Sequence, residues 1–230
     1  MARRRIDAVI FDLDDTLFDC TGQLTEPARR RAALTLAAAI PDSDAPALQR
    51  MQATLADQLS SADSIREIAR RHELPADVVE HALSAYNRDQ VEDIAPFPDA
   101  LSTLEELAAR RYRLCLVTTG RPERQRRKVD LLGLRGHFSE ESGTLVFHDD
   151  RRDPEKDEAL QRAVRFFSLS PCRILSVGDK LNSEIAASKR LGMRTARMCS
   201  GRQKNQRPRT PEERPDHELS RLTDLLALLP

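Results

Sequence analysis

The chain has 230 residues, enough to bury a substantial core in one domain or in one domain that carries an insertion. Acidic and basic residues balance at 37 each, so the net charge gives no reason to expect nucleic acid or a membrane surface as a partner. No apolar run is long enough to span a membrane, and the four cysteines lie far apart without a CxxC pair, which indicates free thiols in a reducing compartment. The basic start MARRR is not followed by an apolar stretch of signal-peptide length, because Asp7 and Asp12 interrupt it. We therefore expect a cytoplasmic protein whose partner is a small molecule, and the oligomeric state is left open.

Three short apolar runs, partly β-branched and separated by helical patterns, predict buried parallel strands. In chain order they are residues 6–11, 113–117 and 173–177. Periodicity and capping residues predict helices that start near Asp99, run over about 122–132, open with DPEK at 153–156, cover about 183–191 and close the chain at 219–229. Strands that alternate with helices indicate an α/β protein built on a parallel sheet.

Residues 19–94 differ in character from the rest of the chain. They contain no strand-like run and break into amphipathic helical stretches, for example 26–40 and 75–90. We interpret residues 19–94 as a helical insertion and residues 1–18 with 95–230 as the core.

Polar residues follow each of the three apolar runs. These residues are Asp12, Asp14 and Thr16 after the first run, Thr118, Thr119 and Gly120 after the second, and Gly178, Asp179 and Glu184 after the third. Because the ligand crevice of a doubly wound sheet lies outside the carboxyl ends of its strands, we expect the three groups to converge. Carboxylates so close together need a cation, and an all-oxygen set without His or Cys favours a hard ion such as Mg²⁺.

The segments DLDDT at 12–16, LVTTG at 116–120 and GDKLNSE at 178–184 resemble the first, second and fourth motifs of the haloacid dehalogenase (HAD) superfamily, in particular its phosphatase-like members with a helical cap. The resemblance implies a Rossmann-like parallel sheet core with an inserted all-helical cap domain. It also implies a Mg²⁺-dependent phosphomonoesterase that hydrolyses a small phosphorylated metabolite through an aspartyl-phosphate intermediate. The identity of that metabolite stays open.

The same resemblance implies a role for each motif residue. Asp12 is the expected nucleophile, and Asp14 is the expected general acid and base. Thr118 is expected to bind a phosphoryl oxygen, within a phosphate-binding turn that includes Thr119 and Gly120.

The expected metal ligands also come from the resemblance. Mg²⁺ is expected on the carboxylates of Asp12 and Asp179 and on the backbone carbonyl of Asp14, with Glu184 holding its waters. This ion would offset the repulsion between a carboxylate and a phosphate.

The third motif of the family is a lysine, and here the chain departs from the commonest spacing. The segment DDRRDPEKDEAL at 149–160 offers Arg151, Arg152 and Lys156. We favour Lys156 as the catalytic and phosphate-binding cation because it stands four residues before Leu160, as in some relatives. A lysine in the first turn of a helix is also unfavourable unless an anion compensates it.

Three alternative functions compete with the phosphatase. A phosphoryl-transfer mutase is disfavoured because such relatives often carry Gly where this chain has Asp15. A 2-haloacid dehalogenase is disfavoured by Asp14, since those enzymes need no metal and generally lack the second aspartate. A catalytically silent binding module is disfavoured because no essential position is lost. The Arg-rich stretch RPERQRRK at 121–128 is interpreted as the solvated face of a helix.

Overall fold

The computed structural model describes residues 5–56, 59–88, 91–149 and 156–229. The chain divides into two compact units. One unit combines Met1–Thr21 with Val91–Pro230, and the other is Gly22–Gln90. All strands of the described residues belong to the first unit, whereas the second is helical.

Within the described residues, the first unit holds a six-stranded sheet in the order β3-β2-β1-β4-β5-β6, in which every neighbouring pair is parallel. The strands are β1 (Ala8–Phe11), β2 (Arg113–Thr119), β3 (Leu145–His148), β4 (Ile174–Gly178), β5 (Arg194–Met198) and β6 (His217–Leu219). The predicted α/β class with a parallel sheet is confirmed. The three apolar runs became β1, β2 and β4, which are adjacent at the centre of the sheet, and the strand order reverses beside β1.

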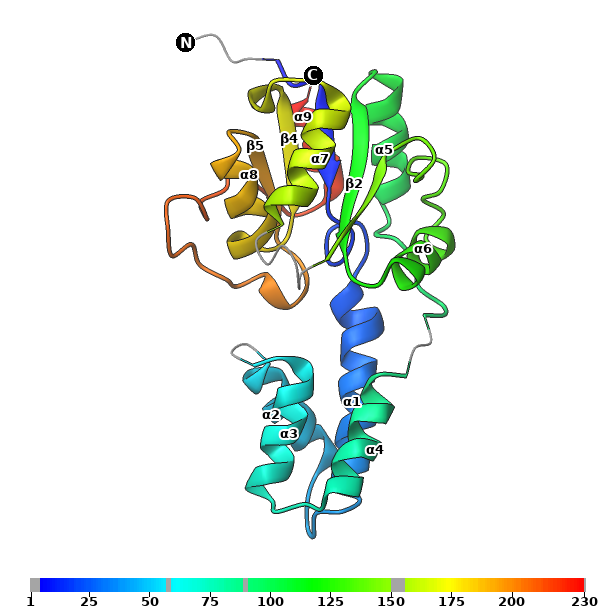
Figure 1. Cartoon of the computed structure of the whole chain (residues 1–230), viewed down its shortest axis with the longest axis vertical. Helices are drawn as coiled ribbons and strands as arrows, with labels where there is room; N and C mark the ends of the chain where they lie inside the picture. The colour runs from blue at the N-terminus through cyan, green and yellow to red at the C-terminus, as the bar shows by residue number, and fades with distance from the viewer. Residues whose placement is uncertain (1–4, 57–58, 89–90, 150–155, 230) are drawn as a thin grey trace. The chain divides into compact units, whose positions relative to one another are not determined.

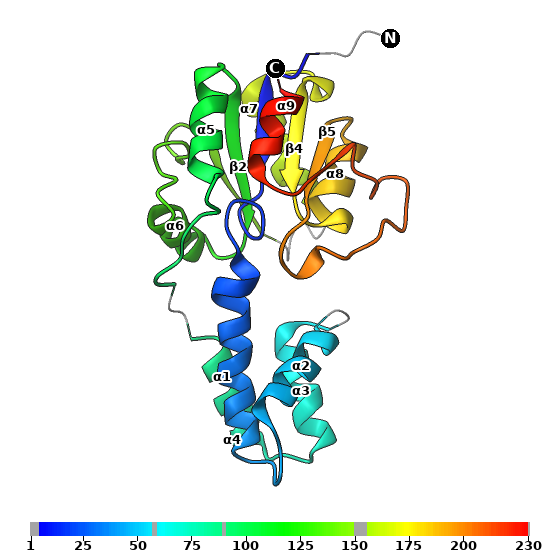
Figure 2. The same cartoon turned by 180° about the vertical axis from the view of Figure 1, so that it is seen from behind.

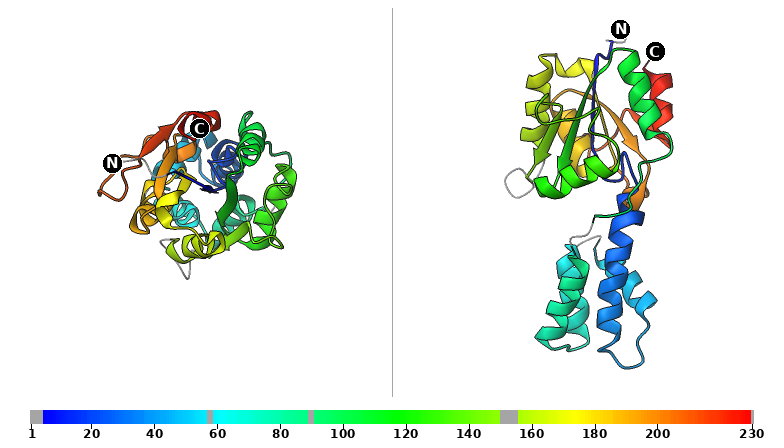
Figure 3. Two further views of the ribbon diagram at one scale, coloured as in Figure 1. Left: turned by 90° about the horizontal axis from the view of Figure 1, so that it is seen from above. Right: turned by 90° about the vertical axis from the view of Figure 1, so that its right-hand side faces the viewer.

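Helices cover both faces of the sheet, with α5 and α9 on one face and α7 and α8 on the other (Figures 1, 2 and 3). The helices of this unit are α5 (Ala100–Ala109), α6 (Pro122–Leu131), α7 (Asp157–Phe167), α8 (Ala186–Arg190) and α9 (Leu225–Leu228). Ala8 and Ile10 of β1 pack in one buried cluster with Leu160 and Phe167 of α7. All four residues of β1 are buried, as expected for a central strand covered on both faces.

The helical unit has its own hydrophobic core. Its helices are α1 (Glu26–Ala37), α2 (Ala45–Leu55), α3 (Ser61–Arg71) and α4 (Ala76–Tyr86). Leu36, Leu48, Ile65 and Ile68 are among the buried residues of this core. Among the described helices of both units, none is long and apolar enough to cross a membrane.

Candidate active site

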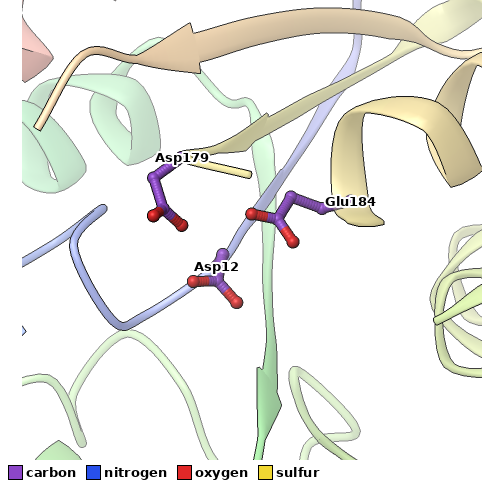
Figure 4. A group of neighbouring side chains, drawn as sticks. All are labelled: Asp12, Asp179 and Glu184. Atoms are coloured by element: carbon purple, nitrogen blue, oxygen red, sulfur yellow. The ribbon is translucent and has the colours of Figure 1, made fainter. Parts of the chain in front are cut away.

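Two of the predicted site residues are the first residues beyond neighbouring central strands. β1 ends at Phe11 and β4 ends at Gly178, so Asp12 and Asp179 emerge at the same edge of the sheet. The Asp12 N–H donates to the carbonyl of Val177 at 2.9 Å, which holds the two strand ends together. Figure 4 shows the side chains of Asp12 and Asp179 close to each other at this edge.

Glu184 reaches the same place from the π-helical turn Leu181–Ile185, which follows β4. Its Oε1 accepts a hydrogen bond from the backbone N–H of Lys180 at 2.7 Å. A Cβ atom on Gly178 would overlap the Glu184 side chain. Glycine at 178 is therefore required for Glu184 to fold back over the end of β4.

Asp12, Asp179 and Glu184 form a buried carboxylate cluster, in which one oxygen from each residue lies within 4.8 Å of the others. Burial raises the pKa of Asp12 to about 6 against the opposing charge of Lys156. Burial and the charge of Glu184 raise the pKa of Asp179 well above its ordinary value. In both residues, burial disfavours the ionised form of the carboxyl group.

The carboxylate cluster fits a hard divalent cation. Both carboxylate oxygens of Asp179 are buried and have no hydrogen-bond partner, which is costly for a charged group. The cluster offers only oxygen ligands, as Mg²⁺ prefers. A cation on Asp12 and Asp179 would pair the unsatisfied oxygens and favour the ionised form of both acids.

Lys156 contacts this cluster directly. Its Nζ lies 2.5 Å from Asp12 Oδ1 and 3.8 Å from Glu184 Oε2, and the residue is 1% exposed. Burial alone would lower the pKa of Lys156, but the charges of Asp12 and Glu184 hold that pKa above its ordinary value. Lys156 is therefore a charged ammonium group beside the expected nucleophile.

The expectation that Lys156 lies in the first turn of a helix is wrong. The helix α7 begins at Asp157, and Lys156 precedes it with a φ of 65°, in the left-handed region. This conformation is uncommon for a residue with a long side chain and is kept where surrounding contacts favour it. The ion pair with Asp12 is such a contact. The alternative candidates Arg151 and Arg152 lie outside the described residues, as does the DPE segment expected to start the helix.

A second lysine, Lys180, adds positive charge to the cluster. Although burial opposes its charged form, the charges of Glu184, Asp179 and Asp12 raise the pKa of Lys180. With all groups ionised, the three carboxylates and two ammonium groups leave one net negative charge. A divalent cation would make the site net positive, which suits a phosphate dianion.

The second motif lies at the end of β2. Thr118 is buried, and its Oγ1 accepts a hydrogen bond of 2.8 Å from Nε2 of Gln125 on α6. The Thr119 hydroxyl is hydrogen-bonded to Nδ1 of His148 on β3 at 2.8 Å. Gly120 follows with a φ of 129°, a conformation that favours glycine. Since side chains alternate along a strand, Thr118 and Thr119 point to opposite faces of the sheet.

Asp14 has a partner that sequence reasoning missed. Nζ of Lys128, on α6, lies 2.7 Å and 2.8 Å from the two carboxylate oxygens of Asp14. Lys128 is buried, whereas the Asp14 side chain is partly exposed. The interpretation of residues 121–128 as a solvated helix face is therefore wrong for Gln125 and Lys128. Their helical spacing with Val129 and Leu132, which places all four on one inward face, was the available signal.

Asp15 holds the turn after Asp14 rather than joining the carboxylate cluster. It adopts a φ of 59°, which aspartate tolerates better than most residues. Its carboxylate accepts hydrogen bonds from the backbone N–H of Thr21 at 2.7 Å and from the Thr21 hydroxyl at 2.6 Å.

Comparison with known proteins identifies the family of the chain. The family model described as haloacid dehalogenase-like hydrolase matches residues 6–192, a span that runs from β1 past α8. The glyceraldehyde 3-phosphate phosphatase of Methanopyrus kandleri is 28% identical to this chain, in an alignment that covers 96% of each chain. A predicted phosphoglycolate phosphatase from Haemophilus somnus has a similar fold, with a TM-score of 0.71 at 20% identity over 98% of both chains. The HAD-hydrolase YfnB from Bacillus subtilis, solved with magnesium bound, has a TM-score of 0.63 at 20% identity over 98% of this chain and 99% of its own. The chain therefore belongs to the haloacid dehalogenase-like hydrolase family.

Proposed function

We propose that the protein is a Mg²⁺-dependent phosphomonoesterase that hydrolyses a small phosphorylated metabolite through an aspartyl-phosphate intermediate. The observation that carries this proposal is the buried contact between Asp12 and Lys156 inside the carboxylate cluster. An ammonium group on Oδ1 leaves Oδ2 of Asp12 available for attack and places positive charge where a phosphoryl group would lie.

The proposed reaction has two displacements at phosphorus. In the first, Asp12 forms a bond to phosphorus, the ester P–O bond breaks, and Asp14 gives its proton to the departing alkoxide. In the second, Asp14 takes a proton from water, the water oxygen bonds to phosphorus, and the acyl-phosphate bond to Asp12 breaks to release inorganic phosphate. Thr118 donates its hydroxyl hydrogen to a phosphoryl oxygen in both steps.

Asp12, Asp179 and the Asp14 carbonyl would hold Mg²⁺, with Glu184 beside them. When bound, this ion supplies positive charge that offsets the repulsion between the Asp12 carboxylate and the phosphate. Lys156 complements it by keeping the Asp12 oxygen and the phosphoryl oxygens close together.

The first substrates to test are three-carbon phosphate esters, because a similar protein of nearly equal length is a glyceraldehyde 3-phosphate phosphatase. We expect release of inorganic phosphate from p-nitrophenyl phosphate and from at least one member of a metabolite panel that includes glyceraldehyde 3-phosphate, in each case only with Mg²⁺. We expect no chloride from 2-chloropropionate. Chloride release without metal, or phosphate release that is equally fast after EDTA treatment, would contradict the proposal.

Asp179→Ala is expected to raise the Mg²⁺ concentration that gives half-maximal activity and to lower the maximal rate, because it removes one of two proposed carboxylate ligands. The metal-free variant should be as stable as wild type or more so, since a buried carboxylate without partners is lost. The rise in melting temperature on adding Mg²⁺ should shrink or vanish. Calorimetry and phosphate release measure both effects. The exposed Glu141→Ala is the control, and an undiminished Mg²⁺-dependent shift in Asp179→Ala would exclude Asp179 as a ligand.

The helical unit Gly22–Gln90 is proposed to act as the cap that excludes water and selects the substrate. Its separate hydrophobic core supports an independent role. Exchange of residues 22–90 for the helical unit of a relative with another specificity should change the preferred metabolite but keep Mg²⁺-dependent hydrolysis of p-nitrophenyl phosphate. An unchanged metabolite preference would count against a cap.

A further inference from the structure

We propose that Gln125 is a positioning residue that directs the hydroxyl hydrogen of Thr118 toward the phosphoryl group. This inference rests on the proposed function, because it assigns Thr118 a phosphoryl oxygen as its acceptor. It assigns a role to a residue outside the recognised motifs, on the inward face of α6.

The orientation of the Gln125 amide follows from its partners. Gln125 is 2% exposed, and its Nε2 donates to two oxygens, Thr118 Oγ1 at 2.8 Å and the backbone carbonyl of Thr119. A carbonyl oxygen can only accept, so the nitrogen and not the oxygen of the amide must face the end of β2. The reversed amide would set two carbonyl oxygens against each other.

The direction of the Thr118 hydroxyl follows in turn. An amide group has two hydrogens, and both are used, one for each oxygen. Thr118 Oγ1 is therefore the acceptor in its bond with Gln125, and its own hydrogen points elsewhere. Within the described part of the chain, no acceptor contacts that hydrogen, and Thr118 itself is 1% exposed. A buried hydroxyl hydrogen without an acceptor suits a ligand that only accepts, such as a phosphoryl oxygen.

Packing does not explain a glutamine at this position. The Oε1 atom of Gln125 is buried without a hydrogen-bond partner, which opposes stability. Methionine has similar volume and would avoid this unpaired oxygen. The two N–H groups are what glutamine provides here and methionine would not.

Two substitutions separate the direction of the hydroxyl from the shape of the side chain. Gln125→Glu keeps the size but replaces the donors with an acceptor, so the Thr118 hydrogen turns toward the new carboxylate. Gln125→Met keeps the approximate volume and removes both donors, so the hydroxyl is no longer directed. We expect kcat/KM for p-nitrophenyl phosphate to fall by about 10- to 100-fold in Gln125→Met and further in Gln125→Glu, with weaker inhibition by inorganic phosphate in both.

A double-mutant cycle distinguishes this role from a merely structural one. In a Thr118→Val background there is no hydroxyl to direct, so Gln125→Met should lower kcat/KM by less than about threefold further. Arg127→Met, an exposed change on the same helix, should have no effect in either background. Thermal unfolding confirms that each variant is folded.

The inference is overturned if Gln125→Met reduces kcat/KM by the same factor with and without the Thr118 hydroxyl, or if it leaves wild-type activity unchanged. Failure of the proposed function has a different signature, because wild-type protein itself would then release no phosphate from any ester.

Discussion

Asp12→Asn is expected to abolish turnover while the protein remains folded. The amide has nearly the shape of the carboxylate but is too weak a nucleophile to attack phosphorus. Loss of the nucleophile from a covalent mechanism lowers kcat by a factor on the order of 10⁴–10⁶. Lys156 keeps Glu184 as a neighbour at 3.8 Å, so its charge is not left without any acidic partner.

Steady-state phosphate release and circular dichroism of purified Asp12→Asn measure these two expectations. Rapid acid quenching with ³²P-labelled substrate should trap label on wild-type protein and none on the variant. Asp42→Asn is the matched control, because Asp42 is exposed and its φ of 54° suits asparagine equally well. Near wild-type turnover in Asp12→Asn would rule out the covalent mechanism.

Lys156→Met is expected to lower kcat by about 10²–10³, the usual effect of removing one preorganised electrostatic partner from a water-poor site. The physical reason is the 2.5 Å contact with Asp12, which holds the carboxylate and neutralises it as the phosphoryl group approaches. Because Lys156 is buried against this carboxylate and not exposed on a helix, its loss should also lower the melting temperature of the metal-free protein. Added Mg²⁺ should restore part of that stability.

Kinetics and thermal unfolding, each with and without Mg²⁺, test this expectation. Lys156→Arg should rescue little activity, because a guanidinium group is larger and the site encloses the side chain. Lys204→Met, at an exposed position, is the control for loss of one positive charge. Arg151→Met and Arg152→Met should have far smaller effects. If one of these arginine variants loses most of its kcat and Lys156→Met keeps nearly all of it, that arginine fills the role of the third motif.

Helix α6 shows where sequence patterns mislead. The stretch RPERQRRK is so rich in charge that its helix is expected to be largely solvated, yet Gln125 and Lys128 are buried. Periodicity places both residues on the same face as Val129, but it does not identify the polar groups that their side chains contact. Gln125 contacts Thr118 near the end of β2, and Lys128 contacts Asp14 beyond the end of β1.

Strand β5, which the sequence analysis did not predict, has a similar explanation. The strand β5 reads RTARM and carries two arginines, so no apolar run marks it. Arg197 is nevertheless buried, because its guanidinium donates to the backbone carbonyls of Gln203 at 2.6 Å and Gln206 at 3.1 Å. The segment has little strand propensity of its own. Its pairing with β4 and the hydrogen bonds of Arg197 to these carbonyls stabilise it as a strand.

The sequence by itself determined the three central strands and the residues that follow them, because a strand covered on both faces must be apolar and must end where polar residues begin. The same pattern predicts that Asp12, Asp179 and Glu184 lie at one edge of the sheet. Only the tertiary structure decided the partners of these groups. Lys156 reaches Asp12 across 144 residues of chain, and Lys128 reaches Asp14 across 114. Such contacts form only when the sheet has assembled, and they override local preference: the ion pair with Asp12 holds Lys156 in a left-handed conformation that its own side chain disfavours.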